Sequence, residues 1–152
     1  MPDDTLPMAA LLEEMDRYYG AAGTEPAADR VRQINEALFA SPPFAWALLA
    51  WDGAVLAGVA AYSFVWPAVG LTRSLYLKEL YVADAYRRRG AGKLLMRALF
   101  DEAAKHKCSR VEWTTDTSSA GAQAFYADLG LREEASKIFY RAEDTGSGFP
   151  PL

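Results

Sequence analysis

Apolar residues recur at helical spacing in two segments near the amino terminus. The first stripe consists of Met8, Leu11, Leu12, Met15 and Tyr19. Asp4 or Thr5 can cap this helix, and Gly20 suits its end. The second stripe consists of Val31, Ile34 and Leu38, and Ser-Pro-Pro at residues 41–43 stops it. The spacing therefore predicts two amphipathic helices, the second running to about Phe39.

Longer apolar runs follow, and they have strand character. Residues 44–51 and 54–66 are joined by Asp52-Gly53, a dipeptide that tolerates the positive φ of a tight antiparallel hairpin. Residues 75–82 form a third run, in which Glu79 is the odd polar member. We expect two adjacent strands followed by a third strand at the centre of the sheet.

A helical period returns after Gly92. The apolar face consists of Leu94, Leu95, Ala98, Leu99 and Ala103. Beyond it the sequence predicts a strand over 109–115, a short helix over 120–128 that Gly130 stops in a left-handed conformation, and strands over 131–134 and 137–142. Residues 143–152 are expected to be a disordered tail.

The order of these elements indicates the fold class. Strands alternate with helices through the second half of the chain, which is typical of an α/β protein with a mixed central β-sheet flanked by helices and at least one parallel crossover. With 152 residues, of which 51% are hydrophobic, a single domain over residues 1–142 is expected.

Composition excludes several classes of function. The net charge of -4 argues against nucleic-acid binding, and no apolar run is long enough for a membrane span. The start of the chain lacks the features of a signal peptide, so a cytoplasmic protein is expected. The single cysteine, Cys108, has no second cysteine for an internal disulfide. The single histidine, His106, has no partner for a metal site or a histidine-dependent triad, so no metal is expected.

A glycine-containing turn between a strand and a helix is the strongest candidate site. Gly90 and Gly92 follow three consecutive arginines and precede a helix expected from about Lys93. The first amides of a helix and the positive end of its dipole bind phosphate, and glycines let a ligand approach the backbone. A Gly-x-Gly before a helix also occurs in ordinary turns, but the arginines favour phosphate binding. The spacing matches neither a P-loop nor a Rossmann fingerprint.

Two motifs in this region resemble those of the GNAT family of N-acetyltransferases. Residues 82–95 read VADAYRRRGAGKLL, which is similar to the family's Arg-x-x-Gly-x-Gly motif between a strand ending in valine and an apolar helix. Residues 125–131 read FYADLGL, which is similar to the second family motif. The resemblance extends over about residues 44–140. It implies a GNAT fold and acetyl-CoA as the co-substrate.

The resemblance also implies which residues bind this cofactor. The pantetheine arm and acetyl carbonyl would lie along the backbone of Leu80, Tyr81 and Val82, where neighbouring strands separate. The turn that would hold the pyrophosphate consists of Arg87, Arg88, Arg89, Gly90, Ala91, Gly92 and Lys93. Ser119 and Ala122 match further cofactor positions, although the family commonly has asparagine where Ser119 stands.

Acetyl transfer to an amine needs a proton donor for the leaving thiolate and a neutral amine. The tyrosine that matches Tyr126 is the general acid of the family, and a phenol can donate to a thiolate. The alternative is that Tyr126 packs on the sheet. Glu79 is the candidate base, acting directly or through water. It could instead bind a cationic substrate or face solvent.

The acceptor is expected to be a primary amine of a small molecule: a diamine, a polyamine or an amino-acid-like compound. Near Glu79 the chain is most similar to diamine and thialysine acetyltransferases, but Lys78 replaces one of their two acids, which weakens the case for a polyamine. Candidates for the acceptor cleft are Tyr18, Tyr19, Trp66, Lys78, Tyr81 and Trp113.

Other readings remain open. The acceptor could be a protein or peptide amine, or the chain could be a regulatory module that binds acyl-CoA without turnover. Because the family usually opens with a strand, while residues 1–6 leave little room for one, the first edge strand is expected to be very short or absent. Many members of the family pair through their sheets or carboxyl-terminal strands, so the resemblance is compatible with a homodimer.

Overall fold

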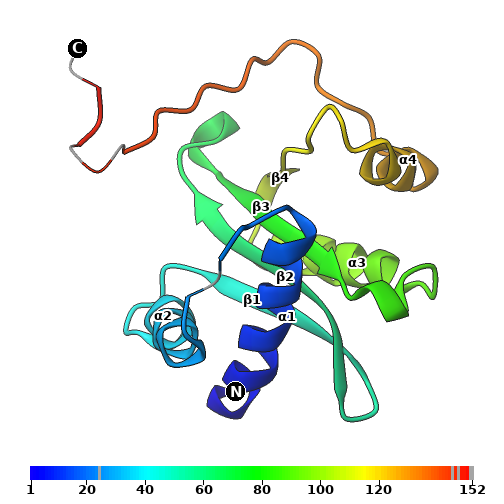
Figure 1. The fold of residues 1–152 in the computed structure, drawn as a ribbon. Coiled ribbons are helices and arrows are strands. Elements are labelled where there is room, and N and C mark those ends of the chain that lie inside the picture. The colour runs from blue at the N-terminus through cyan, green and yellow to red at the C-terminus, as the bar shows by residue number, and fades with distance from the viewer. Residues whose placement is uncertain (24, 145, 147, 151–152) are drawn as a thin grey trace. The chain divides into compact units, whose positions relative to one another are not determined.

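The computed structural model describes residues 1–23, 25–144, 146 and 148–150 (Figure 1). It divides into two compact units, Met1–Thr114 and Thr115–Leu152. The disordered tail predicted over 143–152 includes residues 145, 147, 151 and 152, which lie outside the described residues. Within the described residues, no helix combines the length and the apolar character that a membrane span requires.

The first unit is built on a four-stranded sheet with the order β1-β2-β3-β4. Its strands are β1 (Trp46–Asp52), β2 (Val55–Val65), β3 (Arg73–Val82) and β4 (Cys108–Glu112). The β1–β2 and β2–β3 pairs are antiparallel, and the β3–β4 pair is parallel. This arrangement confirms the mixed sheet and the interior position of β3.

The turn between β1 and β2 differs from the prediction by one position. Asp52 pairs with Val55, so the central turn residues are Gly53 and Ala54 rather than Asp52 and Gly53. Gly53 has a φ of 58°, a left-handed conformation that glycine adopts at little cost. Gly53 correctly indicated where the hairpin lies, and the pairing of Asp52 with Val55 determines which two residues form the turn.

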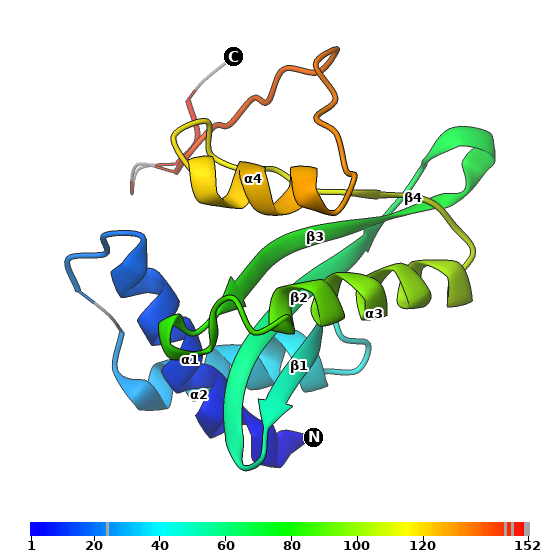
Figure 2. The same ribbon diagram turned by 90° about the vertical axis from the view of Figure 1, so that its right-hand side faces the viewer.

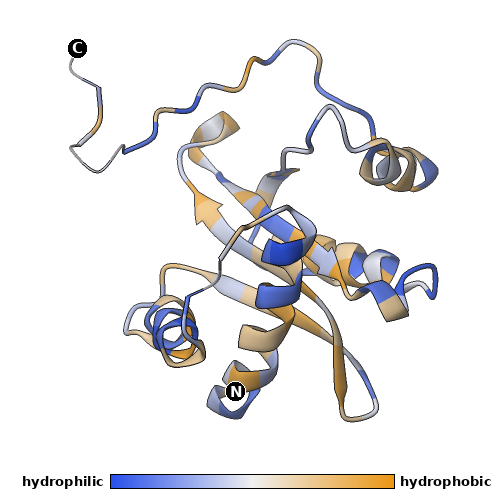
Figure 3. Cartoon of the chain, in the orientation of Figure 1, coloured by the Kyte–Doolittle hydropathy of each residue, from blue (hydrophilic) through white to orange (hydrophobic). Residues whose placement is uncertain are grey.

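Three helices cover the sheet of this unit: α1 (Thr5–Tyr18), α2 (Ala27–Phe39) and α3 (Ala91–Lys105). Helices α1 and α2 lie on one face of the sheet and α3 on the other (Figure 2). Met8, Leu11 and Ile34 pack with Val59 and Tyr81 on the first face. The strands of the β1–β2 hairpin are largely apolar, whereas the carboxyl-terminal half of α1 is polar (Figure 3).

Helix α3 packs directly on the backbone of β2 at Gly58. A Cβ atom added there would lie 3.0 Å from the carbonyl oxygen of Tyr81 and 3.1 Å from Cδ1 of Leu95. Leu95, Met96 and Leu99 are buried against this face of the sheet. The absence of a side chain at Gly58 therefore lets the first turns of α3 lie close to the end of β3.

The amino terminus contains no strand in the described residues 1–23. Residues Pro2–Asp4 form a single 3-10 turn, and α1 follows at once from Thr5. The Thr5 hydroxyl donates to the Pro2 carbonyl at 2.6 Å, which fixes this turn. The outcome agrees with the expectation of a short or absent first strand.

In the second unit, α4 (Ala120–Asp128) has the predicted bounds. The Leu131 amide donates to the Tyr126 carbonyl at 3.0 Å, and the Gly130 amide donates to Ala127 at 2.9 Å. With Gly130 at a φ of 77°, these bonds form a Schellman motif. The glycine and the following leucine of the FYADLGL motif therefore terminate the helix.

The two strands predicted over 131–134 and 137–142 are wrong. These residues carry no strand, and residues 134–137 form a local turn in which the Lys137 amide donates to the Glu134 carbonyl. The Glu134 side chain also accepts hydrogen bonds from Ser136. A strand needs a backbone partner, and the sequence of a segment does not show whether that partner exists. Strand β4 likewise ends at Glu112, three residues before the predicted end at residue 115.

Candidate active site

The amino end of α3 presents backbone amides without helical partners. Gly90 is the N-cap, with φ 88° and ψ -2°, and the first helical bond runs from the Leu94 amide to the Gly90 carbonyl at 3.0 Å. The amides of Ala91, Gly92 and Lys93 therefore precede the helical hydrogen bonds. No side chain of the described chain caps this end. A helix end of this kind binds an anion.

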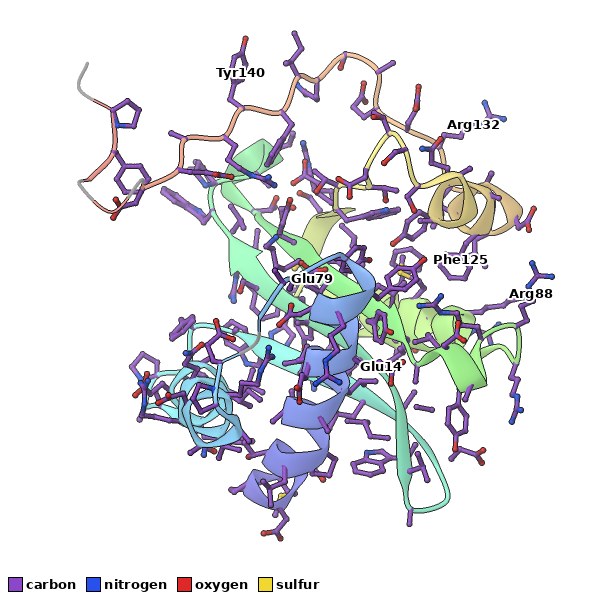
Figure 4. All side chains as sticks on the ribbon, in the orientation of Figure 1. Glu14, Glu79, Arg88, Phe125, Arg132 and Tyr140 are labelled. Atoms are coloured by element: carbon purple, nitrogen blue, oxygen red, sulfur yellow. The ribbon has the colours of Figure 1, made fainter. Side chains whose placement is uncertain are left out.

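The turn before α3 holds positive charge at the same end. Arg88 has a φ of 61° and Gly90 a φ of 88°, so two left-handed residues bend the chain within three positions. Arg88, Arg89 and Lys93 are exposed, and Arg88 points outward from the turn (Figure 4). A Cβ on Gly90 would meet nothing within 4 Å, so the space above this backbone is open to a ligand.

Arg87 has different contacts from the other two arginines. Its Nε donates to the Val82 carbonyl at 3.1 Å, and its Nη1 lies 3.3 Å from Oδ1 of Asp84. Its guanidinium carbon lies 4.3 Å from the ring centroid of Tyr18 and 5.5 Å from that of Tyr81. The sequence grouped three arginines as phosphate ligands, and Arg87 differs from the other two because its guanidinium contacts Val82, Asp84 and Tyr18.

One edge of β3 is open next to this turn. Pairing between β3 and β4 ends at Tyr76 and Glu112, whereas β3 continues to Val82. The Ala83 amide donates to Ala57 on the β2 side at 2.9 Å. Because backbone groups alternate in direction along a strand, those of Val82 and Leu80 face the open edge.

This alternation distinguishes among the three strand residues predicted to hold the cofactor arm. Leu80 and Val82 present backbone groups to the edge, whereas those of Tyr81 are directed to β2, where Tyr81 pairs with Val59. The side chain of Tyr81 is buried, with 3% of its surface exposed, so it is not available to line an acceptor cleft as the sequence suggested.

A β-bulge places Lys78 and Glu79 together. Ala61 pairs with Glu79 and Tyr62 with Leu77, so Lys78 is an extra residue in β3. Neighbouring side chains of a regular strand point to opposite faces, yet Nζ of Lys78 lies 3.5 Å from Oε1 of Glu79. The bulge explains why these opposite charges meet in a partly exposed pair.

Aromatic residues gather near Glu79 at the end of α1. Glu79 and Tyr81 share the face of β3 that packs against α1. The ring of Tyr18 lies 6.0 Å from Tyr81 and 5.2 Å from Tyr19, and both Tyr18 and Tyr19 are more than half exposed. The structure thus places Tyr18 and Tyr19 at the end of α1, beside Tyr81 on the same face of β3 as Glu79.

Of the two tryptophans proposed for the acceptor cleft, Trp113 lies next to the pairing of Glu112 with Tyr76, whereas Trp66 lies elsewhere on the sheet. Trp113 directly follows β4 and is half-buried. Trp66 follows β2 beside the start of β3, because Val65 pairs with Ser74, and its Nε1 donates to Leu71 at 3.1 Å. Seven strand positions separate Ser74 from Tyr81, about 20 Å, so Trp66 does not belong with Tyr18.

Glu14 contacts two residues next to the candidate site, and the sequence analysis did not single it out. Its Oε1 accepts hydrogen bonds from the Tyr81 hydroxyl at 2.9 Å and from the Asp84 amide at 3.1 Å (Figure 4). Burial raises the pKa of Tyr81 to about 12, with further contributions from the hydrogen bond and charge of Glu14, while Arg87 opposes the shift. One feature of the sequence could have indicated Glu14: it lies three residues after Leu11 and four before Tyr18, which places its carboxylate on the same side of the predicted helix.

In the second unit, the remaining candidate residues belong to α4. Ser119 is the N-cap of α4, and Ala122 lies in the first turn. Tyr126 lies in the last turn, with its ring 5.1 Å from that of Phe125. The Schellman motif holds the backbone of Tyr126 through its carbonyl, which fixes where the side chain leaves the helix.

Comparison with known proteins identifies the family. The sequence model described as the acetyltransferase (GNAT) family matches residues 8–131. The chain therefore belongs to the GNAT family of acetyltransferases, and its mixed sheet flanked by helices is the GNAT fold.

Individual relatives agree with this assignment. L-ornithine N5-acetyltransferase NATA1 of Arabidopsis thaliana is 32% identical over 78 residues, a match that spans 51% of this chain but only 34% of that protein. An integron cassette protein from the mobile metagenome of V. cholerae is 27% identical, with a TM-score of 0.86 over 95% of this chain and 90% of its own. The aminoglycoside N-acetyltransferase AAC(6')-Iy in complex with CoA, 21% identical, shares the fold with a TM-score of 0.74 over 91% of this chain and 88% of its own.

Replacing Tyr81 with phenylalanine is expected to remove one late-titrating tyrosine. Because its pKa is raised from 10.0 to about 12, the phenol stays neutral in the folded protein at a pH where the unfolded chain ionises it. Its contribution to stability is complete below pH 10.0 and is lost as the pH rises toward about 12.

Tyrosinate absorbance during an alkaline titration measures this effect. Tyr62 serves as an internal reference. Burial and the neighbouring Glu102 raise the pKa of Tyr62 to about 12, so this residue should titrate late in both proteins. If the variant instead loses absorbance change near pH 10.0 and keeps the whole late phase near pH 12, Tyr81 is not held in this way.

Proposed function

We propose that this chain transfers the acetyl group of acetyl-CoA to a primary amine of a small acceptor, with residues 1–142 acting as one domain. The observation that carries the proposal is the combination of an uncapped helix end with an open strand edge. Strand β3 ends at Val82 and α3 begins at Ala91, so both features lie at one end of β3. A ligand that fits them has an anionic group beside an extended, hydrogen-bonding arm.

CoA has this chemistry. Its pyrophosphate would accept hydrogen bonds from the amides of Ala91, Gly92 and Lys93, with Arg88 and Arg89 adding positive charge. Its pantetheine arm contains amides that can pair with the backbone of Leu80 and with the Val82 amide as a short extra strand would, while the Val82 carbonyl accepts from Arg87. Arg87 supports the turn in this proposal and leaves phosphate contact to its neighbours.

The transfer itself requires three proton movements. Glu79 would take the first proton from the acceptor ammonium, directly or through water, which leaves a neutral amine. The amine nitrogen attacks the thioester carbonyl carbon, a C–N bond forms, and the C–S bond breaks to release a thiolate. By family resemblance, Tyr126 would give a proton to the thiolate, and the second proton that the nitrogen loses as the amide forms would restore the Tyr126 phenol through water. By the same resemblance, Ser119 and Ala122 would contact the cofactor.

The acceptor we favour is an amino-acid-like amine that carries its own carboxylate. Lys78 and Glu79 offer opposite charges side by side, which suits a zwitterion. A diamine would bring a second ammonium toward Lys78 and be repelled. The exposed rings of Tyr18 and Tyr19 can add cation-π attraction, and Trp113 remains a further candidate. The name of the ornithine acetyltransferase relative agrees with this class of acceptor.

Replacing Tyr126 with phenylalanine tests catalysis. If Tyr126 is the general acid, kcat with acetyl-CoA and L-ornithine should fall about 100-fold while the Kd for CoA stays within about threefold. Tyr140→Phe is the matched control, because Tyr140 is 86% exposed in the same unit. Unchanged turnover in Tyr126→Phe would refute the acid role, and CoA binding by the parent without turnover on any amine would favour the regulatory module.

Replacing Lys78 with glutamate tests the acceptor class. L-Ornithine and putrescine differ by the carboxylate that Lys78 is proposed to attract. The ratio of kcat/KM for ornithine to that for putrescine should fall at least about tenfold in Lys78→Glu, because an attractive charge becomes a repulsive one. Lys105→Glu makes the same charge change at the far end of α3. An unaltered ratio in Lys78→Glu would remove Lys78 from acceptor selection.

A further inference from the structure

Glu14 joins α1 to the segment that leads from the sheet into the cofactor turn. One oxygen of its carboxylate accepts from the Tyr81 hydroxyl, in the last residues of β3, and from the Asp84 amide, two residues after β3 ends. The second of these bonds spans 70 positions of sequence. Glu14 therefore holds the chain at the point where it leaves the sheet.

Ala83 and Tyr86 of this connection pack against the core, while the backbone hydrogen bonds that follow Ala83 are short-range. The Tyr86 amide donates to Ala83 at 2.8 Å and the Arg87 amide to Asp84 at 3.3 Å, both within one 3-10 turn. The Arg87 side chain returns to Val82 and Asp84. These bonds shape the turn, but they do not fix it to a neighbouring helix.

Asp84 and α1 are linked from two directions. The Asp84 amide binds Glu14, while its carboxylate pairs with Arg87. Arg87 in turn lies over the ring of Tyr18, one helical turn beyond Glu14 on α1. The resulting Glu14 network consists of Glu14, Tyr18, Tyr81, Asp84 and Arg87.

From this network we infer that Glu14 is a positioning residue for CoA binding, which holds the turn over residues 84–90 so that the amides of α3 meet the pyrophosphate. The inference rests on the proposed function, because it assigns the role of Glu14 to the same cofactor site. It also joins the two sides of the reaction, since Tyr18 belongs to the proposed acceptor cleft and Arg87 to the cofactor turn.

A carboxylate is suited to this task because a single oxygen accepts two donors. Hydrogen bonds to a charged acceptor are stronger than neutral ones, and one donor here, the Tyr81 hydroxyl, belongs to a buried ring. An amide oxygen at position 14 could accept the same two bonds without the charge. A methyl group could accept neither, so glutamine and alanine separate the hydrogen bonds from the rest of the residue.

The experiment compares the parent with Glu14→Gln, Glu14→Ala and a control, Glu36→Ala. Glu36 lies on α2 and pairs with Arg32 on the surface, so its loss removes a carboxylate without touching the turn. Calorimetric titration measures the Kd for CoA. Hydrogen exchange without ligand, in peptides covering residues 83–93, measures how firmly the turn is held.

In Glu14→Ala we expect CoA affinity to fall about fivefold and exchange to quicken in residues 83–93 more than in the core of α1 or β3. Glu14→Gln, which keeps both hydrogen bonds without the charge, should fall between the parent and Glu14→Ala in both measurements, and Glu36→Ala should match the parent. A general loss of stability would instead raise exchange throughout the first unit and spare no segment.

Parent-like binding and parent-like exchange in Glu14→Ala would overturn the inference. If the parent itself fails to bind CoA, the proposed function fails, and the exchange measurement alone decides whether Glu14 holds the turn. If Glu14→Ala does not fold, Tyr81→Phe removes one of the two hydrogen bonds, and faster exchange in residues 83–93 is again expected. Unchanged exchange in that variant would count against the inference.

Discussion

The amino end of α3, where no side chain caps the first amides, is the feature on which the rest of the candidate site depends. Helix α3 lies close to the sheet because Gly58 carries no side chain, and Gly90 bends the chain into the helix with a left-handed φ. As a result, the unsatisfied amides of Ala91 to Lys93 stand beside the last residues of β3, where one strand edge is open. Electrostatics and backbone geometry then favour one kind of ligand, an anion with an extended arm.

Much of this arrangement could be predicted from local sequence. The stripe of apolar residues and the glycine signals placed α2 and α4 closely, and Gly90 with its arginines located the helix end, because these features depend on a few neighbouring residues. The strands predicted over 131–142 failed for the opposite reason. Local sequence can make a segment a candidate strand, but whether the strand forms depends on pairing with a distant segment.

The contacts that distinguish one candidate residue from another are made between segments that are distant in the sequence. The engagement of Arg87 with Val82 and Tyr18 cannot be read from a run of three arginines. The bulge that makes Lys78 and Glu79 neighbours arises from the register with β2, and Glu14 meets Asp84 across 70 positions. Sequence therefore located the glycine-containing turn before α3, while the fold determined which charges are exposed and which contact the backbone.

The central claim is that CoA binds at the amino end of α3, and calorimetric titration of CoA into Gly90→Asp and Gly90→Asn tests it most directly. Both residues tolerate a positive φ better than most, and they have nearly the same shape, so they differ chiefly in charge. The account predicts that the parent binds CoA and that Gly90→Asp binds at least about tenfold more weakly than Gly90→Asn, because a carboxylate would face the phosphates. Equal affinity in the two variants, or no CoA binding by the parent, would contradict it.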